Sequence, residues 1–191
     1  FLQHYLTLKT HDEVNTGHIF ATFTSYADRA TKPSNDPADS PVKQTVQDHL
    51  AQLRDYGKVF RKFQDPPDGT RAAVFFDRLE SIDTTTVIPF LLAAFHELDK
   101  GRIDDLNQIL IDLESFLTRR MICGLTNKNY NRLFLDLIRD CETAGQITVS
   151  GVRAFLAKLE GDSVRWPNDD EMLEAFLSRP AYTTLSQAKL R

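Results

Sequence analysis

Long apolar runs and clustered cysteines are both missing from this sequence, and each absence excludes a class of protein. No apolar run approaches the roughly 20 residues that a membrane-spanning helix needs, and the N-terminus lacks the basic-then-apolar layout of a signal peptide. The only two cysteines, Cys123 and Cys141, have no second Cys or His close by in the sequence, which argues against a zinc site. We therefore expect a cytoplasmic protein without membrane contact and with two buried free thiols; a disulfide between them is the alternative.

Motifs that carry chemistry are equally scarce. The five histidines form no His-x-x-x-His pair, and no Ser or Cys stands in the setting of a nucleophile. The carboxylate clusters at 104–105 and 169–171 lie where helices are expected to start, and the helix dipole favours acidic residues there. We therefore expect no catalytic residue, no metal and no cofactor in this chain. A metal-dependent helical hydrolase that uses Asp104, Asp169 or Glu171 is the alternative.

What the sequence does contain is helical spacing of apolar residues along almost its whole length, and no pair of strands is credible. The sequence therefore predicts an all-α fold, a compact multi-helix bundle of about eight or nine helices. We expect residues 1–191 to form a single helical domain, with a division into 1–64 and 70–191 as the alternative. Because the chain starts without Met in what looks like the middle of a helix, we expect a fragment of a larger protein. The predicted helices span 18–30, 41–64, 72–82, 84–100, 104–124, 126–141, 148–160, 169–177 and 183–191.

Individual capping and breaking residues define several of these boundaries. Pro41 is expected at the first position of its helix, whereas Pro89 either kinks its helix or marks the true start. A glutamate three residues after a cap, such as Glu171, indicates a capping box. The expected N-terminal caps are Ser40, Thr126 or Asn127, and Asn168. The apolar stripe expected on the helix at 41–64 comprises Val42, Val46, Leu50, Leu53, Gly57, Phe60 and Phe63.

The segment 113–135 places an arginine pair where the helical pattern calls for apolar residues. If 104–124 is one helix, Arg120 falls near the middle of its apolar stripe and Arg119 about a third of a turn to the side. A charge in a buried stripe is costly unless it is paired or has a function. The favoured interpretation is structural, with a carboxylate as the partner of Arg120; the candidates are Glu80, Glu97 and Glu114. The alternatives are a contact with another domain and the binding of a DNA or nucleotide phosphate.

Basic residues are also concentrated just after this pair. The formal net charge of −4 argues against wholesale nucleic-acid binding, but it leaves a local basic surface open. On the helix expected after residue 126, three basic side chains and Asp136 share one face. Such a face is usually solvated, and it can also follow a DNA backbone. The residues considered for contact with DNA or a neighbouring domain are Arg119, Arg120, Lys128, Arg132 and Arg139.

Several short motifs, taken in order, resemble one known family. They are the segments 88–92, 114–120 and 126–134, followed by Trp166-Pro167 with Asp169 and Glu171, and by Pro180 with Tyr182. Together they are similar to the helical middle of the GmrSD-type restriction endonucleases, also described as domain of unknown function 262. The resemblance covers roughly residues 88–191, and residues 1–64 fit more loosely.

This resemblance implies a function. Family members carry a nucleotide-handling N-terminal domain with an Asp-Gly-Gln-Gln-Arg motif, and many end in an HNH-type nuclease with a His-Ile-x-Pro motif that cuts foreign DNA bearing modified bases. This chain contains neither motif, and it has Met172 and Ala181 where the family usually shows an aromatic residue and Leu. The implied role is a non-catalytic helical domain of a type IV, modified-DNA restriction endonuclease, which couples the flanking nucleotide-binding and nuclease domains and contacts DNA. The alternative is a freestanding helical module that binds other proteins through apolar grooves.

Overall fold

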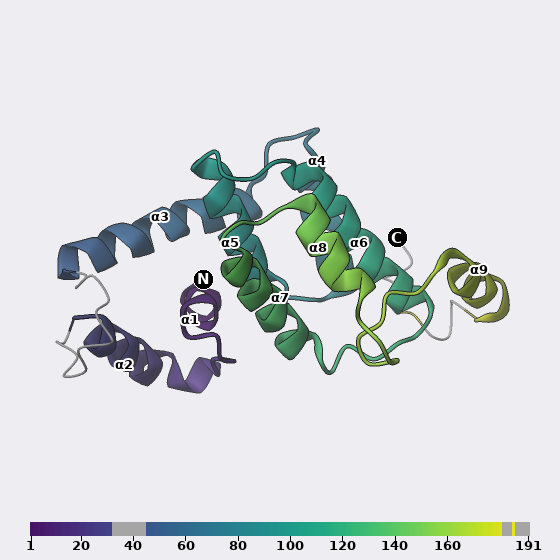
Figure 1. Ribbon diagram of the computed structural model, residues 1–191, viewed down its shortest axis with the longest axis horizontal. Coiled ribbons are helices and arrows are strands. Elements are labelled where there is room, and N and C mark those ends of the chain that lie inside the picture. Colours follow the sequence, from purple (N-terminus) through teal and green to yellow (C-terminus); the bar gives the residue numbers. More distant parts are fainter. Residues whose placement is uncertain (32–44, 181–184, 186–191) are drawn as a thin grey trace.

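The computed structural model describes residues 1–31, 45–180 and 185, and this part of the chain is all-α (Figure 1). Within these residues the chain forms nine α-helices and one short 3₁₀ helix, and its only β-type pairing is an isolated parallel bridge between Ile103 and Ile147. The predicted fold class is therefore confirmed. The predicted last helix at 183–191 lies outside the described residues, apart from Leu185. The elements are α1 (Leu2–Thr10), η1 (Thr16–His18), α2 (Ile19–Thr31), α3 (Val46–Gln64), α4 (Arg71–Ile82), α5 (Ile88–Asp99), α6 (Leu106–Ile122), α7 (Tyr130–Ala144), α8 (Val149–Ala157) and α9 (Asp169–Ser178).

Helix α5 lies at the centre of the fold because it is apolar on nearly every side. All of its residues from 88 to 95 are buried except Ala93, which is partly covered. A helix of this composition must be covered all round, and α1, α3, α6 and α7 pack against it. The buried side chains form one continuous cluster that runs from Tyr5 in α1 to Leu156 in α8. None of the helices in the described ranges is both long and apolar enough to cross a membrane.

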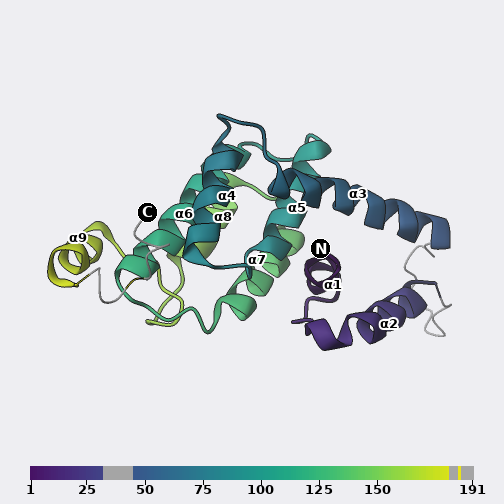
Figure 2. The same ribbon diagram turned by 180° about the vertical axis from the view of Figure 1, so that it is seen from behind.

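The two ends of the molecule extend beyond this core. Helix α6 packs against α4, α8 and α9 on one side of α5. Helices α3 and α9 reach out at opposite ends of the elongated molecule, and both views show α9 standing apart from the other helices (Figures 1 and 2). The described chain is therefore a packed middle with α2 and α3 at one end and α9 at the other (Figure 1).

Helix α3 starts later than its sequence predicts. The expected start at Ser40 and Pro41 lies outside the described residues, and the helix begins at Val46, where the side chain of Thr45 forms a capping box. The predicted apolar stripe is wrong in the first two turns of α3, because Val46 and Leu50 are exposed. The first turns of α3 bury another face instead: His49 is buried, and its ring lies 5.3 Å from that of Tyr26 in α2.

The predicted caps of α7 are also wrong. The helix begins at Tyr130 after Asn129, whose side chain makes no capping hydrogen bond. Thr126 and Asn127 precede this start, and the Thr126 hydroxyl accepts a hydrogen bond from the backbone N–H of Lys128 at 3.3 Å. A short polar turn therefore occupies the positions at which the sequence predicts the first turn of the helix.

At Pro89 the structure decides between the two predicted alternatives, and at Asn168 it confirms the predicted helix start. Helix α5 begins at Ile88, so Pro89 lies in its first turn, where the missing N–H has no helical partner to lose. Pro89 therefore marks a start and not a kink. At α9 the predicted capping box forms: Asn168 Oδ1 accepts from the Glu171 N–H at 2.9 Å, and Glu171 Oε2 accepts from the Asn168 N–H at 3.0 Å.

Candidate functional site

The last turn of α6 carries the arginine pair that the sequence singles out. Arg120 lies in the buried stripe of the helix, as its position predicts, and 0% of its surface is exposed. Among the described residues it is the largest side chain that is fully buried. Because no water reaches the guanidinium, its positive charge must find all its partners within the protein.

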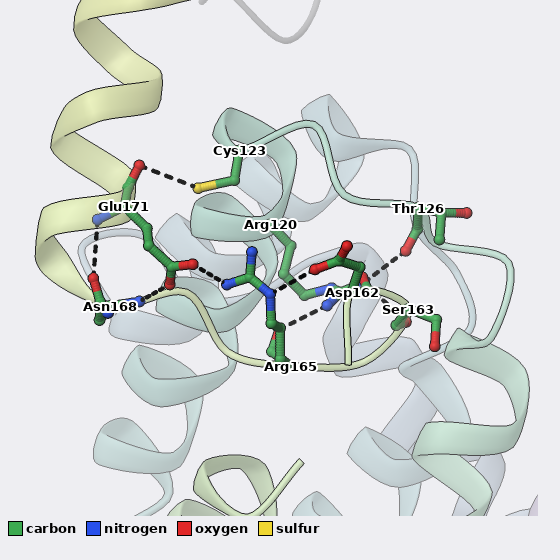
Figure 3. Close-up of polar contacts among 8 residues, drawn as sticks. All are labelled: Arg120, Cys123, Thr126, Asp162, Ser163, Arg165, Asn168 and Glu171. Atoms are coloured by element: carbon green, nitrogen blue, oxygen red, sulfur yellow. Dashed lines mark hydrogen bonds and ion pairs between the residues drawn. The ribbon is translucent and has the colours of Figure 1, made fainter. Parts of the chain in front are cut away.

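Backbone carbonyl oxygens surround the Arg120 guanidinium (Figure 3). Its Nε donates to the Tyr130 hydroxyl at 3.1 Å. Its two terminal nitrogens donate to the carbonyl oxygens of Thr126 at 2.6 Å, Arg165 at 2.7 Å, Ser163 at 2.9 Å and Asp162 at 3.3 Å. Hydrogen bonds to a charged group each contribute roughly 1.5–3 kcal/mol. The charge is therefore stabilised by protein dipoles in place of water, and Arg120 is not accessible to a DNA phosphate.

The predicted carboxylate partner of Arg120 is wrong. The three candidate glutamates have other surroundings: Glu80 is exposed, Glu97 pairs with Arg102, and Glu114 pairs with Arg71 and Arg78. A guanidinium has five N–H donors in one plane, which is more than a single carboxylate accepts. Uncharged carbonyl groups satisfy these donors without the cost of burying a second ion.

Two aromatic rings complete the surroundings of this cation. The Cζ atom of Arg120 lies 5.4 Å from the ring centre of Phe116 and 5.3 Å from that of Tyr130. The negative faces of such rings attract a cation, most strongly where water is absent. Burial raises the pKa of the Tyr130 hydroxyl, although Arg120 acts in the opposite direction, so the hydroxyl is neutral at physiological pH.

The loop between α8 and α9 is folded so that its backbone meets Arg120. Gly161 has a φ of 87°, and its carbonyl accepts a hydrogen bond from the Arg165 N–H at 2.8 Å. The Arg165 side chain binds the Asp162 carboxylate at 2.9 Å and also pairs with Glu171 in α9 (Figure 3). The loop is therefore tied to α6 through its backbone and to α9 through a side chain.

Arg119 joins α6 to the first residue of α9. Its guanidinium donates to the Pro167 carbonyl oxygen at 3.2 Å and pairs with the Asp169 carboxylate. Next to it, the ring of Trp166 packs edge-on against Phe116, with the ring centres 6.2 Å apart. The charge of Arg119 is therefore paired with a carboxylate of the same chain, although its side chain is 22% exposed.

Arg179 makes a matching contact at the other end of α9, and the sequence pattern alone does not single it out. Its guanidinium donates to the Ile122 carbonyl oxygen at 2.7 Å, where the negative end of the α6 dipole favours a cation. The guanidinium occupies the space that a Cβ atom would need at Gly124, which has a φ of 67°. A glycine after a helix signals a left-handed C-terminal position, but it does not reveal which cation fills the space.

Helix α9 is therefore held at both ends by the last turn of α6, yet none of its residues is buried. Leu173, Phe176 and Leu177 are 58%, 70% and 76% exposed, and their i, i+3, i+4 spacing places them on one side of the helix. We call these three residues the α9 apolar face. Neighbouring apolar side chains exposed in this way are typical of a surface that binds protein.

The predicted basic surface of α7 forms only in part. Lys128 is exposed but lies before α7, so it does not share the helix face. Arg132 is 88% exposed and lies 3.7 Å from the Asp136 carboxylate. Arg139 donates to Asp136 at 2.9 Å and to the His11 carbonyl oxygen at 2.6 Å, which ties α7 to the end of α1. Of the five predicted contact residues, Lys128, Arg132 and Arg139 are therefore exposed, and Arg139 is engaged by a carboxylate and a carbonyl of the same chain.

The carboxylates of the alternative hydrolase lie in separate places. The Asp104 carboxylate accepts a hydrogen bond from the Val149 N–H at 3.3 Å, whereas Asp169 and Glu171 pair with arginines at the start of α9. Nowhere in the described ranges do three or more His, Cys, Asp or Glu side chains form a group that could hold a metal ion. The structure does not bring the three candidate ligands together.

Both cysteines are free, as predicted. Cys141 is buried, and burial raises the pKa of its thiol to about 11. Cys123 is only partly covered, contrary to the expected burial, and its Sγ lies 3.7 Å from the Glu171 carbonyl oxygen. Burial also raises the pKa of this thiol. Neither sulfur is therefore activated as a nucleophile.

Comparison of the chain with known protein families, with curated proteins and with solved structures finds no match.

Proposed function

We propose that this chain is a non-catalytic helical domain of a GmrSD-like, modified-DNA restriction endonuclease, in which it couples a nucleotide-binding domain to a nuclease domain. One observation carries the proposal: two of the segments that resemble this family, 114–120 and 166–171, contact each other although they lie far apart in the sequence. Segment 114–120 supplies Arg119, and segment 166–171 supplies Pro167 and Asp169, which Arg119 contacts. Two of the segments behind the resemblance are therefore joined through Arg119.

The contacts between α6 and α9 also suit a coupling role. Because Arg119 and Arg179 hold the two ends of α9, the α9 apolar face is presented outward in a fixed position. A preorganised apolar surface binds a partner with a smaller loss of conformational entropy. The proposed occupant is a flanking domain of the same protein, whose movement would be transmitted through α9 to α6.

A contact with DNA forms the second part of the proposal. Lys128 and Arg132 are exposed near the start of α7, and cations at such positions bind backbone phosphates without reading sequence. Their contribution would be to orient the DNA relative to the nuclease domain.

The test uses the parent enzyme with both flanking domains. A variant that combines Leu173→Ser, Phe176→Ser and Leu177→Ser should retain nucleotide hydrolysis but lose cleavage of modified DNA, because coupling fails. The matched control, Asp170→Ser with Glu174→Ser, alters exposed polar residues of the same helix and should cleave normally. Undiminished cleavage by the apolar-face variant would contradict the proposal, as would nuclease or nucleotide hydrolysis activity of the purified 191-residue chain.

A freestanding protein-interaction module is the second candidate, and the α9 apolar face also favours it. The two candidates differ in what adjoins the chain in its gene. An Asp-Gly-Gln-Gln-Arg motif upstream and a His-Ile-x-Pro motif downstream would favour the nuclease, whereas a gene without them would favour the interaction module.

A further inference from the structure

A cleft with apolar walls lies among the helices of the core, and no residue of α9 lines it. It has a volume of about 290 Å³ and is bordered by α1, α3, α5, α7 and the turn after α7. At about 30 Å³ for each water-sized group, this volume holds on the order of ten non-hydrogen atoms. Its apolar wall is formed by Leu8, Phe90, Ala93, Ile138 and Ile147, and its polar rim by Lys9, Tyr56, Glu97, Arg102, Glu142 and Gln146.

Lys9 enters this cleft without a counterion from the described residues. Its Nζ lies 3.3 Å from the Tyr56 hydroxyl, 4.6 Å from the ring centre of Tyr56 and 5.9 Å from that of Tyr5. Lys9 takes part in none of the ion pairs within the described ranges. Within the described part of the chain, the ammonium group therefore has a hydroxyl and two rings as its close neighbours, and no carboxylate oxygen lies within 4.0 Å of it.

The two carboxylates whose charge acts on Lys9, Glu97 and Glu142, are paired with other side chains. Glu142 Oε2 lies 3.0 Å from Nε2 of His11, and Glu97 binds Arg102 through two hydrogen bonds of 2.5 and 2.6 Å. Burial lowers the pKa of Lys9 to about 8, although Glu142 opposes this effect. The protein thus leaves the charge of Lys9 incompletely compensated.

We propose that this cleft binds a small monoanionic carboxylic acid, whose carboxylate pairs with Lys9 and whose apolar body lies against Phe90 and Ile138. Apolar walls with one convergent charge are typical of sites for small molecules, and this volume is near the lower end of their range. Glu97, Glu142 and the negative C-terminal end of the α7 dipole lie around the same cleft. These negative groups disfavour a dianion such as a phosphate ester, which is why we assign a single carboxylate.

Octanoate is a suitable probe because it has ten non-hydrogen atoms and one carboxylate. Isothermal titration calorimetry on the 191-residue chain at pH 7 should detect one octanoate per chain. Octanol, which lacks the charge, and octyl phosphate, which carries a second negative charge, should each bind at least tenfold more weakly. Equal affinity for octanol would overturn the role of Lys9, tighter binding of octyl phosphate would overturn the monoanion, and the absence of octanoate binding would overturn the site.

Variants locate the binding to the cleft. Lys9→Met keeps the packing of the side chain and should weaken octanoate binding at least tenfold, whereas Lys58→Met, at an exposed lysine of α3, should leave it unchanged. Ala93→Leu fills the cleft while Lys9 is intact, so it should weaken octanoate and octanol alike. Retention of wild-type octanoate affinity by either cleft variant would contradict the proposal. A thermal unfolding transition shows whether each variant is folded. If Lys9→Met does not fold, the octanoate affinity of Ala93→Leu decides whether octanoate binds in the cleft.

The dependence of binding on pH gives a separate readout. Affinity for octanoate should fall about tenfold or more between pH 7 and pH 9.5 as Lys9 loses its proton. The titratable and charged groups near Lys9 are Tyr5, Tyr56, His96, Glu97, Lys100, Arg102, Cys141 and Glu142. Burial raises the pKa of the Cys141 thiol to about 11 and that of the Tyr56 hydroxyl above its usual range, so neither titrates in this interval. An affinity that is constant up to pH 9.5 would contradict the assignment of Lys9.

Discussion

At the scale of single residues, Arg120 holds a full positive charge inside the core, and its partners in the described chain are carbonyl groups and a hydroxyl in place of a carboxylate. Burial of an ion costs several kcal/mol even after the protein relaxes, and here carbonyl dipoles and ring faces offset that cost. The planar guanidinium makes this arrangement possible, because its donors diverge in fixed directions toward several acceptors. Each acceptor contributes to the stability of the fold, because no water could take its place if it were removed.

Tyr130 provides a test of this arrangement. Tyr130→Phe removes the hydroxyl that accepts from Arg120 Nε at 3.1 Å, and an unsatisfied buried donor costs roughly 1–3 kcal/mol. We expect the free energy of unfolding, measured by chemical denaturation, to fall by that amount. Tyr26→Phe is the matched control, because its hydroxyl lies 3.5 Å from Gln52 in a partly exposed position, and it should change stability less. An equal effect of the two substitutions would argue against the importance of the Nε contact.

His4 makes the stability of the protein depend on pH. Burial, followed by the charge of the N-terminal amino group, lowers the pKa of His4 to about 4 in the folded chain, from 6.5 for a free histidine. Between these values the unfolded chain binds more protons than the folded one, so stability falls as the pH falls from about 6.5 to about 4. His4→Phe keeps the packing against Phe60 and should flatten this dependence in denaturation curves at several pH values. His18→Gln, at an exposed position, should leave it unchanged, and an unaltered curve for His4→Phe would contradict the assignment.

At the scale of elements, the C-terminus of α6 organises the helices after it. Arg119, Arg120 and the Ile122 carbonyl bind the start of α9, the loop before it and Arg179 beyond it. Helix α9 thereby has a defined position without a buried side chain. Its stability should accordingly depend on these end contacts more than on packing.

Gly124→Ala tests the contact at the end of α9. A left-handed conformation costs a residue with a Cβ roughly 1–2 kcal/mol, and here the Cβ would also collide with Arg179. Gly145→Ala is the matched control, since Gly145 has a φ of 72° and no atom of the described residues lies within 4 Å of the place that its Cβ would take. We expect Gly124→Ala to reduce the free energy of unfolding by about 1 kcal/mol more than Gly145→Ala does. In an Arg179→Ala background the excess should vanish; its persistence would contradict the steric explanation.

The start of α7 is the element on which the DNA contact is predicted. Lys128→Ala combined with Arg132→Ala should weaken DNA binding by the parent enzyme, and it should reduce the slope of log affinity against log salt by about 1.8, because each phosphate contact contributes about 0.9. Arg54→Ala with Lys58→Ala removes two exposed charges from α3 and should leave the slope unchanged. The same slope for the wild type and the α7 variant would count against this surface.

At the scale of the whole molecule, the helices follow from local sequence, and the contacts between them do not. The capping box of Asn168 and Glu171 depends on residues three positions apart, and it is confirmed. Pro89 marks a helix start, which is one of the two alternatives that its position in the sequence leaves open. The apolar stripe at the start of α3 predicts burial of Val46 and Leu50 that does not occur, because this part of α3 turns the face of His49 toward Tyr26 in α2. Periodicity describes one helix at a time and contains no information about which face a neighbouring helix will cover.

The arginine cluster shows the same limit. Periodicity predicts the burial of Arg120, but its carbonyl partners in the loop lie 42 to 45 residues further along the chain. The Ile122 carbonyl that Arg179 binds is 57 residues away from it. A sequence pattern indicates that a buried charge needs partners, and carboxylates are the usual choice. It does not show that a turn will present three carbonyl groups to the same point.

The central claim is that Arg120 is an internal anchor, and the free energy of unfolding of Arg120→Met tests it most directly. The methionine fills a similar volume but leaves buried carbonyl groups without donors, so chemical denaturation should show a loss of about 3–5 kcal/mol. Arg119→Met, at a partly exposed position, should cost about 1 kcal/mol or less. If Arg120→Met instead unfolds at the same denaturant concentration as the wild type, Arg120 is not the anchor of this fold.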